Sequence, residues 1–269
     1  MQTFTHVFHN GVSAPAYRWK NPDGSEGGIV AESATVNPAV IISPTAEVCP
    51  GASIDEGVEI GDSARIGIDV VVGKGASIGK GSRIGCGASV GDGASVGDGA
   101  SIRDRADIGE YAWIGTGANI GYDVRIGGAA RIGYGAHIGR YAIVGYRVGI
   151  GEGANIGHGA RIGEDARIGD GASICYRSHI GDRASIGEEA SIEQSASIGD
   201  GANIGSSVSI GSYASIGKGS RLGDRTRIGE AASIGEEAWI GADASIGADA
   251  SIDNGARVGE HAIIDSDAR

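Results

Sequence analysis

The chain has 269 residues, of which 51 are Gly and 5 are Pro, and its formal net charge is −12. Glycine at this level would suggest collagen, but no Gly-X-Y triplet repeats through the chain. The 34 acidic residues outnumber the 22 Lys and Arg and no segment is basic, so nucleic acid is not an expected partner. No segment approaches the roughly 18–20 apolar residues of a membrane-spanning helix.

Residues 1–29 are the first predicted element and carry no repeat. They contain both Phe residues of the chain and Trp19. We expect this segment to form an N-terminal cap, because open strand edges of the element that follows would otherwise pair with another chain. Residues 1–20 lack the continuous apolar stretch of a signal peptide. The three cysteines lie far apart, which argues against a disulfide framework, so a cytoplasmic location is expected.

Residues 30–269 are the second predicted element, and they repeat with a period of six. Every sixth residue from Val30 to Ile264 is Val, Ile or Leu, without insertion or deletion. A small residue, usually Ala, lies two positions before each aliphatic residue, and Gly usually follows it. A spacing of two places both side chains on one side of a strand, so each repeat predicts a short strand and a corner. Three such sides would close a triangular coil and place residues 18 apart side by side, giving about 13 coils.

This pattern of aliphatic, Gly, two variable residues, small and variable resembles the hexapeptide-repeat family over residues 30–269. The resemblance implies an all-β fold, a left-handed parallel β-helix in the form of a triangular solenoid. It also implies a homotrimer that transfers an acyl group to a hydroxyl or amine of a small-molecule acceptor, with the site in a groove between subunits. The implied co-substrate is acetyl-CoA or another acyl-CoA, and no bound cofactor is expected.

Residues that depart from the repeat gather in the middle of the chain, where six of the eight Tyr lie between Tyr111 and Tyr176. The 18-residue period places many of them on one corner, which predicts a ligand cleft with a His as general base and Tyr rings as walls. An irregular, solvated edge or a subunit contact is the alternative interpretation. The predicted catalytic residues are His158 and His137, and the predicted substrate or coenzyme A binding residues are Asn119, Tyr122, Arg140, Tyr141, Asn155, Tyr176, Arg177 and Trp113.

Two segments, 108–121 and 234–247, each contain Ala-Trp-Ile-Gly and look like the Trp-Ile-Gly coil of sugar and antibiotic acetyltransferases. Trp113 and Trp239 are then expected on the outer faces of their strands, where contact with another subunit is the alternative role. The family usually has an extended loop and a His before this coil. Here no loop interrupts the repeat, and no His lies between His9 and His137.

A metal site is not predicted within the chain. His137, His158 and His179 are spaced 21 residues apart, one coil plus three residues, so one ion cannot bind all three within ligand distance. Carbonic anhydrases of this superfamily place their metal ligands across a subunit interface, so a metal site between subunits is the alternative. A non-catalytic structural or binding solenoid is the second hypothesis for the whole chain, because the repeat is uninterrupted and functional sites on repeat proteins usually lie on inserted loops.

Overall fold

The structure, a computed structural model, describes residues 2–268, which form strands joined by tight turns and contain no helix. The chain divides into two compact units, Met1–Gly135 and Ala136–Arg269. In both units the strands of the repeat are two residues long and recur every six residues. Within each unit, neighbouring strands of a sheet are parallel and 18 residues apart in the sequence, so the predicted coil of three repeats is confirmed.

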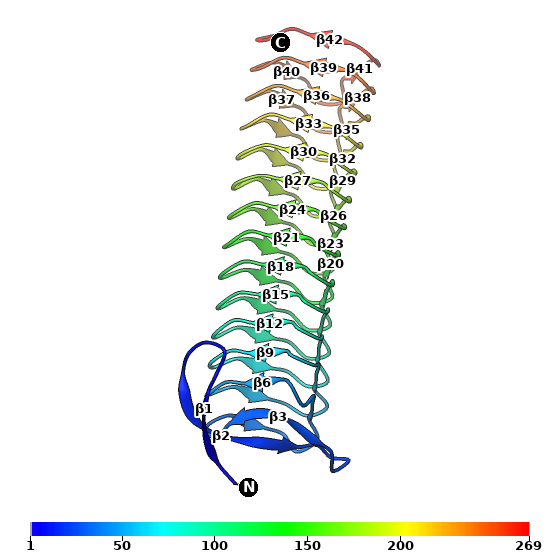
Figure 1. Ribbon diagram of the computed structural model, residues 1–269. Helices are drawn as coiled ribbons and strands as arrows, with labels where there is room; N and C mark the ends of the chain where they lie inside the picture. The colour runs from blue at the N-terminus through cyan, green and yellow to red at the C-terminus, as the bar shows by residue number, and fades with distance from the viewer. Residues whose placement is uncertain (1, 269) are drawn as a thin grey trace. The chain divides into compact units, whose positions relative to one another are not determined.

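The first unit begins with three longer strands, β1 (Phe4–Val7), β2 (Ser13–Lys20) and β3 (Glu26–Ala31), which are blue in Figure 1. β1 pairs antiparallel with β2, and β2 pairs antiparallel with β3. β3 then pairs in parallel with β6, the first coil strand of its sheet. In sheet A, the coil strands of this unit are β6 (Glu47–Val48), β9 (Arg65–Ile66), β12 (Arg83–Ile84), β15 (Ser101–Ile102) and β18 (Asn119–Ile120). In sheet B, they are β4 (Thr35–Val36), β7 (Ser53–Ile54), β10 (Val71–Val72), β13 (Ser89–Val90), β16 (Asp107–Ile108) and β19 (Arg125–Ile126). In sheet C, they are β5 (Ile41–Ile42), β8 (Glu59–Ile60), β11 (Ser77–Ile78), β14 (Ser95–Val96), β17 (Trp113–Ile114) and β20 (Arg131–Ile132).

The second unit contains only coil strands, and its three groups of paired strands are labelled D, E and F here and called sheets. Within each sheet the strands stack in sequence order, as the green to red part of Figure 1 shows. Sheet D contains β21 (His137–Ile138), β24 (Asn155–Ile156), β27 (Ser173–Ile174), β30 (Ser191–Ile192), β33 (Ser209–Ile210), β36 (Arg227–Ile228), β39 (Ser245–Ile246) and β42 (Ile263–Ile264); sheet E contains β22 (Ile143–Val144), β25 (Arg161–Ile162), β28 (His179–Ile180), β31 (Ser197–Ile198), β34 (Ser215–Ile216), β37 (Ser233–Ile234) and β40 (Ser251–Ile252); sheet F contains β23 (Gly149–Ile150), β26 (Arg167–Ile168), β29 (Ser185–Ile186), β32 (Asn203–Ile204), β35 (Arg221–Leu222), β38 (Trp239–Ile240) and β41 (Arg257–Val258).

The core of each unit is the column of aliphatic residues and the small residues that precede them. Nearly all of these side chains are fully buried, for example Ile156 and Ala154. The first residue of each coil strand points outward, since strand side chains alternate between the two faces. A few repeats place Ser or Thr in the small inward position. There the buried hydroxyl donates to a backbone carbonyl, as Ser178 Oγ does to Glu193 O at 2.7 Å, so no polar atom is left without a partner.

The Gly after the aliphatic residue is required by the close approach of neighbouring coils. A Cβ placed on Gly151 would lie 2.5 Å from the backbone nitrogen of Asp170 in the next coil. Gly149, two residues earlier on β23, has open space where its side chain would be. Glycine is therefore a steric requirement at the first position and not at the second.

The acidic corners of the coils are part of the same backbone arrangement. Asp170 Oδ1 accepts a hydrogen bond of 2.8 Å from the backbone N–H of Glu152, one coil earlier. The same contact joins Asp182 to Glu164 and Asp224 to Ser206. Because a corner N–H would otherwise lack a protein partner, much of the acidic character of these edges is explained by backbone hydrogen bonding.

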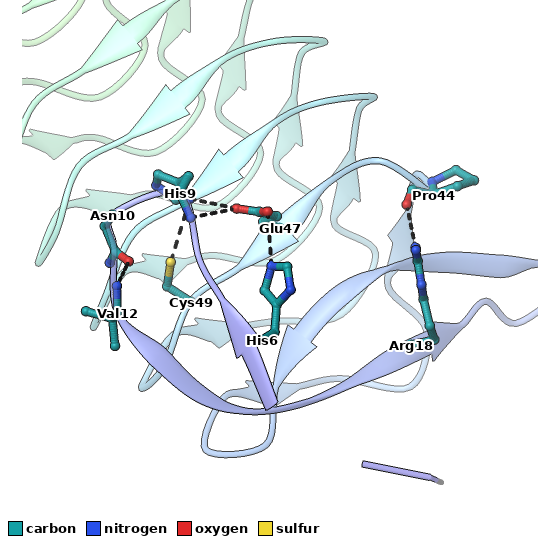
Figure 2. A network of polar contacts seen from close by, with 8 residues as sticks. All are labelled: His6, His9, Asn10, Val12, Arg18, Pro44, Glu47 and Cys49. Carbon is teal, nitrogen blue, oxygen red and sulfur yellow. Dashed lines mark hydrogen bonds and ion pairs between the residues drawn. The ribbon is translucent and has the colours of Figure 1, made fainter. Parts of the chain in front are cut away.

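The β1–β2 hairpin is joined to the first coils of its unit by polar contacts on Glu47 (Figure 2). Glu47 accepts hydrogen bonds from His6 Nε2 at 3.2 Å, from His9 Nδ1 at 3.1 Å and from the His9 backbone N–H at 3.0 Å. Arg18 donates to the Pro44 carbonyl at 2.9 Å. Beneath these contacts Phe8 packs with Cys49 in a small buried cluster.

Candidate functional site

The corner that follows β24 carries His158, whose imidazole lies between two Tyr rings of neighbouring coils. The ring centroids of His158 and Tyr141 are 5.3 Å apart with a tilted geometry. Those of His158 and Tyr176 are 5.4 Å apart and nearly perpendicular, at 89°. All three side chains are exposed, and edge-to-face ring contacts of this kind are favourable and directional. Two neighbours thus restrict the orientation of an imidazole that solvent still reaches.

Backbone hydrogen bonds place these residues in register. Gly159 N–H donates to the Arg140 carbonyl at 2.9 Å, and Arg177 N–H donates to the His158 carbonyl at 3.0 Å. The Arg177 guanidinium lies over the Tyr176 ring, 4.9 Å from its centroid, a distance at which cation–π attraction operates. Tyr141 and Arg177 both have positive φ, 59° and 55°, so each side chain leaves the corner from a left-handed backbone conformation.

A groove of about 600 Å³ opens beside this corner, over the outer face of sheet E. Its lining combines corner residues with the first residues of β22, β25 and β28. The groove therefore contains two imidazoles, two guanidiniums, an aromatic ring and an aliphatic side chain. The lining residues are Tyr141, Ile143, His158, Gly159, Arg161, Arg177 and His179.

Sequence reasoning missed three of these residues as parts of the site: Ile143, Arg161 and His179. Each lies one coil after the previous one, and the structure pairs Ile143 with Arg161 and Arg161 with His179 in sheet E. His179 entered the sequence analysis only as one of three His residues spaced too far apart to bind one metal ion. The signal was present in the 18-residue period, since these outward positions depart from the usual Ser of sheet E.

His137 and Asn155, by contrast, lie on the outer face of sheet D. They are register partners on β21 and β24, and both are exposed. Neither lines the groove that contains His158. Arg140 is an exposed corner residue whose carbonyl takes part in the backbone ladder. The structure therefore separates the two predicted catalytic His onto different sides of one corner.

The other predicted binding residues belong to the first unit. Trp113 is the outward residue of β17, as predicted, and its ring meets the Tyr134 ring edge-on with centroids 5.3 Å apart. The Arg103 guanidinium lies 5.9 Å from the centre of the Tyr122 ring. Asn119 is the half-buried outward residue of β18. Within this unit Trp113 and Tyr122 thus have partners in their own chain.

Among residues 2–268, no group of three His, Cys, Asp or Glu side chains is arranged to hold a metal ion. The same part of the chain contains no helix long and apolar enough to cross a membrane. The three cysteines are all free thiols.

Comparison with known proteins identifies the repeat and the fold. Residues 231–266 match the family described as bacterial transferase hexapeptide (six repeats). The structure is similar to that of Arabidopsis UDP-N-acetylglucosamine acyltransferase, with a TM-score of 0.60 and 17% identity over 81% of this chain and 71% of that chain. At that identity the likeness shows the fold.

Two further solved structures are similar over a large part of the chain. LpxA of Bacteroides fragilis, a UDP-N-acetylglucosamine acyltransferase, has 24% identity over 74% of this chain and 68% of that chain, with a TM-score of 0.29. The acetyltransferase domain of PglB from Neisseria gonorrhoeae, in complex with acetyl coenzyme A, has 18% identity over 67% of this chain and 52% of that chain, with a TM-score of 0.21. No curated protein matches the sequence.

Proposed function

Because the chain is a hexapeptide-repeat protein with a left-handed parallel β-helix fold, we propose that it is an acyltransferase. It would move an acyl group from acyl-coenzyme A to the hydroxyl or amine of a small acceptor. The observation that carries the proposal is His158, an exposed imidazole between two Tyr rings in the lining of a groove of about 600 Å³.

In the proposed reaction His158 is the general base. The acceptor oxygen or nitrogen attacks the thioester carbonyl carbon, and the imidazole takes the proton that the acceptor loses. As the carbon–sulfur bond breaks, the imidazolium returns that proton to the departing coenzyme A thiolate. Imidazole suits both steps, because its ordinary titration range lies near neutral pH. The contacts with Tyr141 and Tyr176 support this role by limiting the directions in which the ring can turn.

Arg161 and Arg177 are the proposed contacts for the phosphates of the coenzyme A donor. Both line the groove with His158, and a guanidinium can bind two phosphate oxygens at once. Asn119, Tyr122, Arg140, Asn155 and Trp113 remain predictions for substrate contacts. His137 remains the alternative base, and in that case the reaction takes place over sheet D.

We further propose that the enzyme is a homotrimer in the cytoplasm. The groove over sheet E is open to solvent in one subunit, so a second subunit packed beside it would exclude water from the reacting groups. The three free cysteines agree with a reducing compartment. Sedimentation equilibrium should give three times the 26.9 kDa of one chain, and a monomer would remove the intersubunit site from the proposal.

The test is release of free coenzyme A thiol from acetyl-CoA in the presence of a panel of small hydroxyl and amine acceptors. His158→Gln should lower kcat at least about 100-fold, the usual contribution of general base catalysis. His261→Gln is the matched control, because His261 is also an exposed corner His of the second unit but lies outside the groove. If only His137→Gln abolishes transfer, the base lies on sheet D. If neither variant affects measured transfer, His-based catalysis is refuted.

A non-catalytic binding or spacer solenoid is the second candidate function. The observation that favours it is the spacing of the strands, which recur every six residues from β4 to β42 with no inserted loop. Turnover of any acyl donor by the purified chain would count directly against it.

A further inference from the structure

The outer face of sheet F carries a second cluster of functional side chains, distant in sequence from His158. Trp239, the outward residue of β38, lies between Arg221 of β35 and Arg257 of β41, since the three residues are register partners on neighbouring strands. Trp239 is 42% exposed, whereas Trp19 is buried and Trp113 is half-buried. A large apolar ring is therefore presented to solvent between two cations.

Neither flanking guanidinium has a partner in the part of the chain that the structure describes. The side chains of Arg221 and Arg257 make no hydrogen bond and no ion pair within residues 2–268, and neither stacks on the indole. Arg225, by contrast, pairs with Asp243 through two hydrogen bonds of 2.7 Å. Because guanidinium groups favour bidentate contacts with carboxylate or phosphate oxygens, the two unpaired groups can each hold an anion.

The surface around the indole is hollowed on both sides. One groove of about 720 Å³ is lined by Arg221, Trp239 and Arg257 together with Glu237 and two glycines. A second groove of about 500 Å³ shares Arg221 and Trp239, and it adds Asn203, Asp224 and Glu260. A ligand that lies across the indole would thus contact cationic and acidic side chains in both grooves and an amide side chain in the smaller one.

This mixture of groups selects the chemistry of the ligand. A ligand whose negative charges are concentrated in one group, such as a polyphosphate, is disfavoured by the nearby carboxylates of Glu237, Asp224 and Glu260 and by the net charge of −12. A neutral ligand would leave the two guanidiniums unused. Sugar rings that bear one carboxylate each provide an anion for Arg, hydroxyl donors for the acidic side chains and an apolar C–H face for the indole.

From these observations we infer that the outer face of sheet F around Arg221, Trp239 and Arg257 is a binding site for an acidic oligosaccharide. The uronate carboxylates pair with the two guanidiniums, and one sugar ring stacks on the indole. The hydroxyls donate to Glu237 in the larger groove and to Asp224 or Glu260 in the smaller one. This site does not depend on the proposed acyl transfer, since it shares no residue with the His158 groove.

The test uses the full chain and trigalacturonate as the probe, with binding measured by isothermal titration calorimetry and by Trp fluorescence. The fluorescence should respond, because Trp239 is exposed whereas Trp19 is buried and Trp113 is half-buried. Trp239→Ala, Arg221→Ser and Arg257→Ser should each weaken binding about tenfold in calorimetry, the effect of one charged or stacking contact. Ser is chosen because the same outward position of sheet F carries Ser185.

Arg167→Ser is the matched control, since Arg167 occupies the same strand position on β26 but lines neither groove. Its affinity for trigalacturonate should equal that of the unchanged chain. The methyl ester of trigalacturonate, which has no charge, should bind at least about tenfold more weakly. The inference is overturned if trigalacturonate shows no binding up to about 10 mM. It is also overturned if Arg167→Ser weakens binding as much as Arg221→Ser, or if AMP or tri-glutamate binds more tightly than trigalacturonate.

Discussion

Arg225 donates two hydrogen bonds of 2.7 Å, from Nε and Nη2, to the two carboxylate oxygens of Asp243, 18 residues later in the chain. Both residues have positive φ, 56° and 60°, at equivalent corners of adjacent coils. Hydrogen bonding by this guanidinium, opposed by partial desolvation, lowers the pKa of the Asp243 carboxyl. The same pairing joins Arg147 to Asp165. These pairs connect coils at positions where most coils have Gly or a short polar residue.

Two substitutions of Arg225 separate the effect of the left-handed backbone on stability from the effect of the ion pair. Arg225→Gly and Arg225→Ala both remove the pair, but only Gly adopts positive φ without steric cost. The Gly variant should therefore melt at a higher temperature than the Ala variant, as measured by circular dichroism. Because exposed pairs contribute little, the Gly variant should melt within a few degrees of the unchanged protein. If the Gly variant is less stable than the Ala variant, the left-handed backbone conformation does not lower the stability of the protein at these corners.

Two glycines separated by one residue should respond in opposite ways to the same change. Gly151→Ala places a Cβ 2.5 Å from the Asp170 backbone nitrogen and should destabilise the fold by about 3 kcal/mol or more. Gly149→Ala enters open space on β23 and should stabilise it by about 0.5–1 kcal/mol. Urea unfolding followed by circular dichroism measures both values. Equal effects of the two changes would contradict the close approach of coils at the corner.

The Glu47 contacts predict how the hairpin responds to acid. Burial raises the pKa of Glu47, but hydrogen bonds from the His9 backbone and from the His6 and His9 rings outweigh it, so the pKa is lowered from 4.5. A lowered folded-state pKa contributes stability above the unfolded-state value, and this contribution is lost as the pH falls through the folded-state value. Glu47→Gln should therefore lower Tm at pH 7, and the difference from the unchanged protein should shrink below about pH 4.

The control for this experiment is Glu59→Gln, at an exposed outward position of β8. Its Tm should follow that of the unchanged protein across the same pH range. A difference for Glu47→Gln that stays constant down to pH 3 would show that the carboxylate charge does not hold the hairpin.

The buried thiol near the hairpin should be chemically inert in the folded protein. Burial, with smaller contributions from Glu47 and Cys86, raises the pKa of Cys49 to about 12, so almost no thiolate forms at pH 8. N-ethylmaleimide should label the half-buried Cys86 first, and Cys49 only after unfolding. Peptide mass spectrometry after timed labelling gives the rates. Labelling of native Cys49 as fast as Cys86 would contradict the packing of Cys49 beneath the hairpin.

The amino-acid sequence by itself determined the coil of this protein. An aliphatic residue every sixth position leaves few ways to bury the whole column, since strand side chains alternate and three short sides close a triangle. The register partners His137 and Asn155, one coil apart, follow directly from that period. The hydrogen bonds of the corner Asp residues to the preceding coil do not follow from that period.

Only the tertiary structure decided which side chains share a site. A corner residue lies between two faces, and the six-residue period does not say toward which face its side chain turns. His158 lines the groove over sheet E with Arg161 and His179, where its ring also contacts the rings of Tyr141 and Tyr176; His137 is not in that lining. Such contacts depend on side-chain torsions and on the spacing between neighbouring coils. Both are set when the coils pack, and neither is encoded in any single repeat.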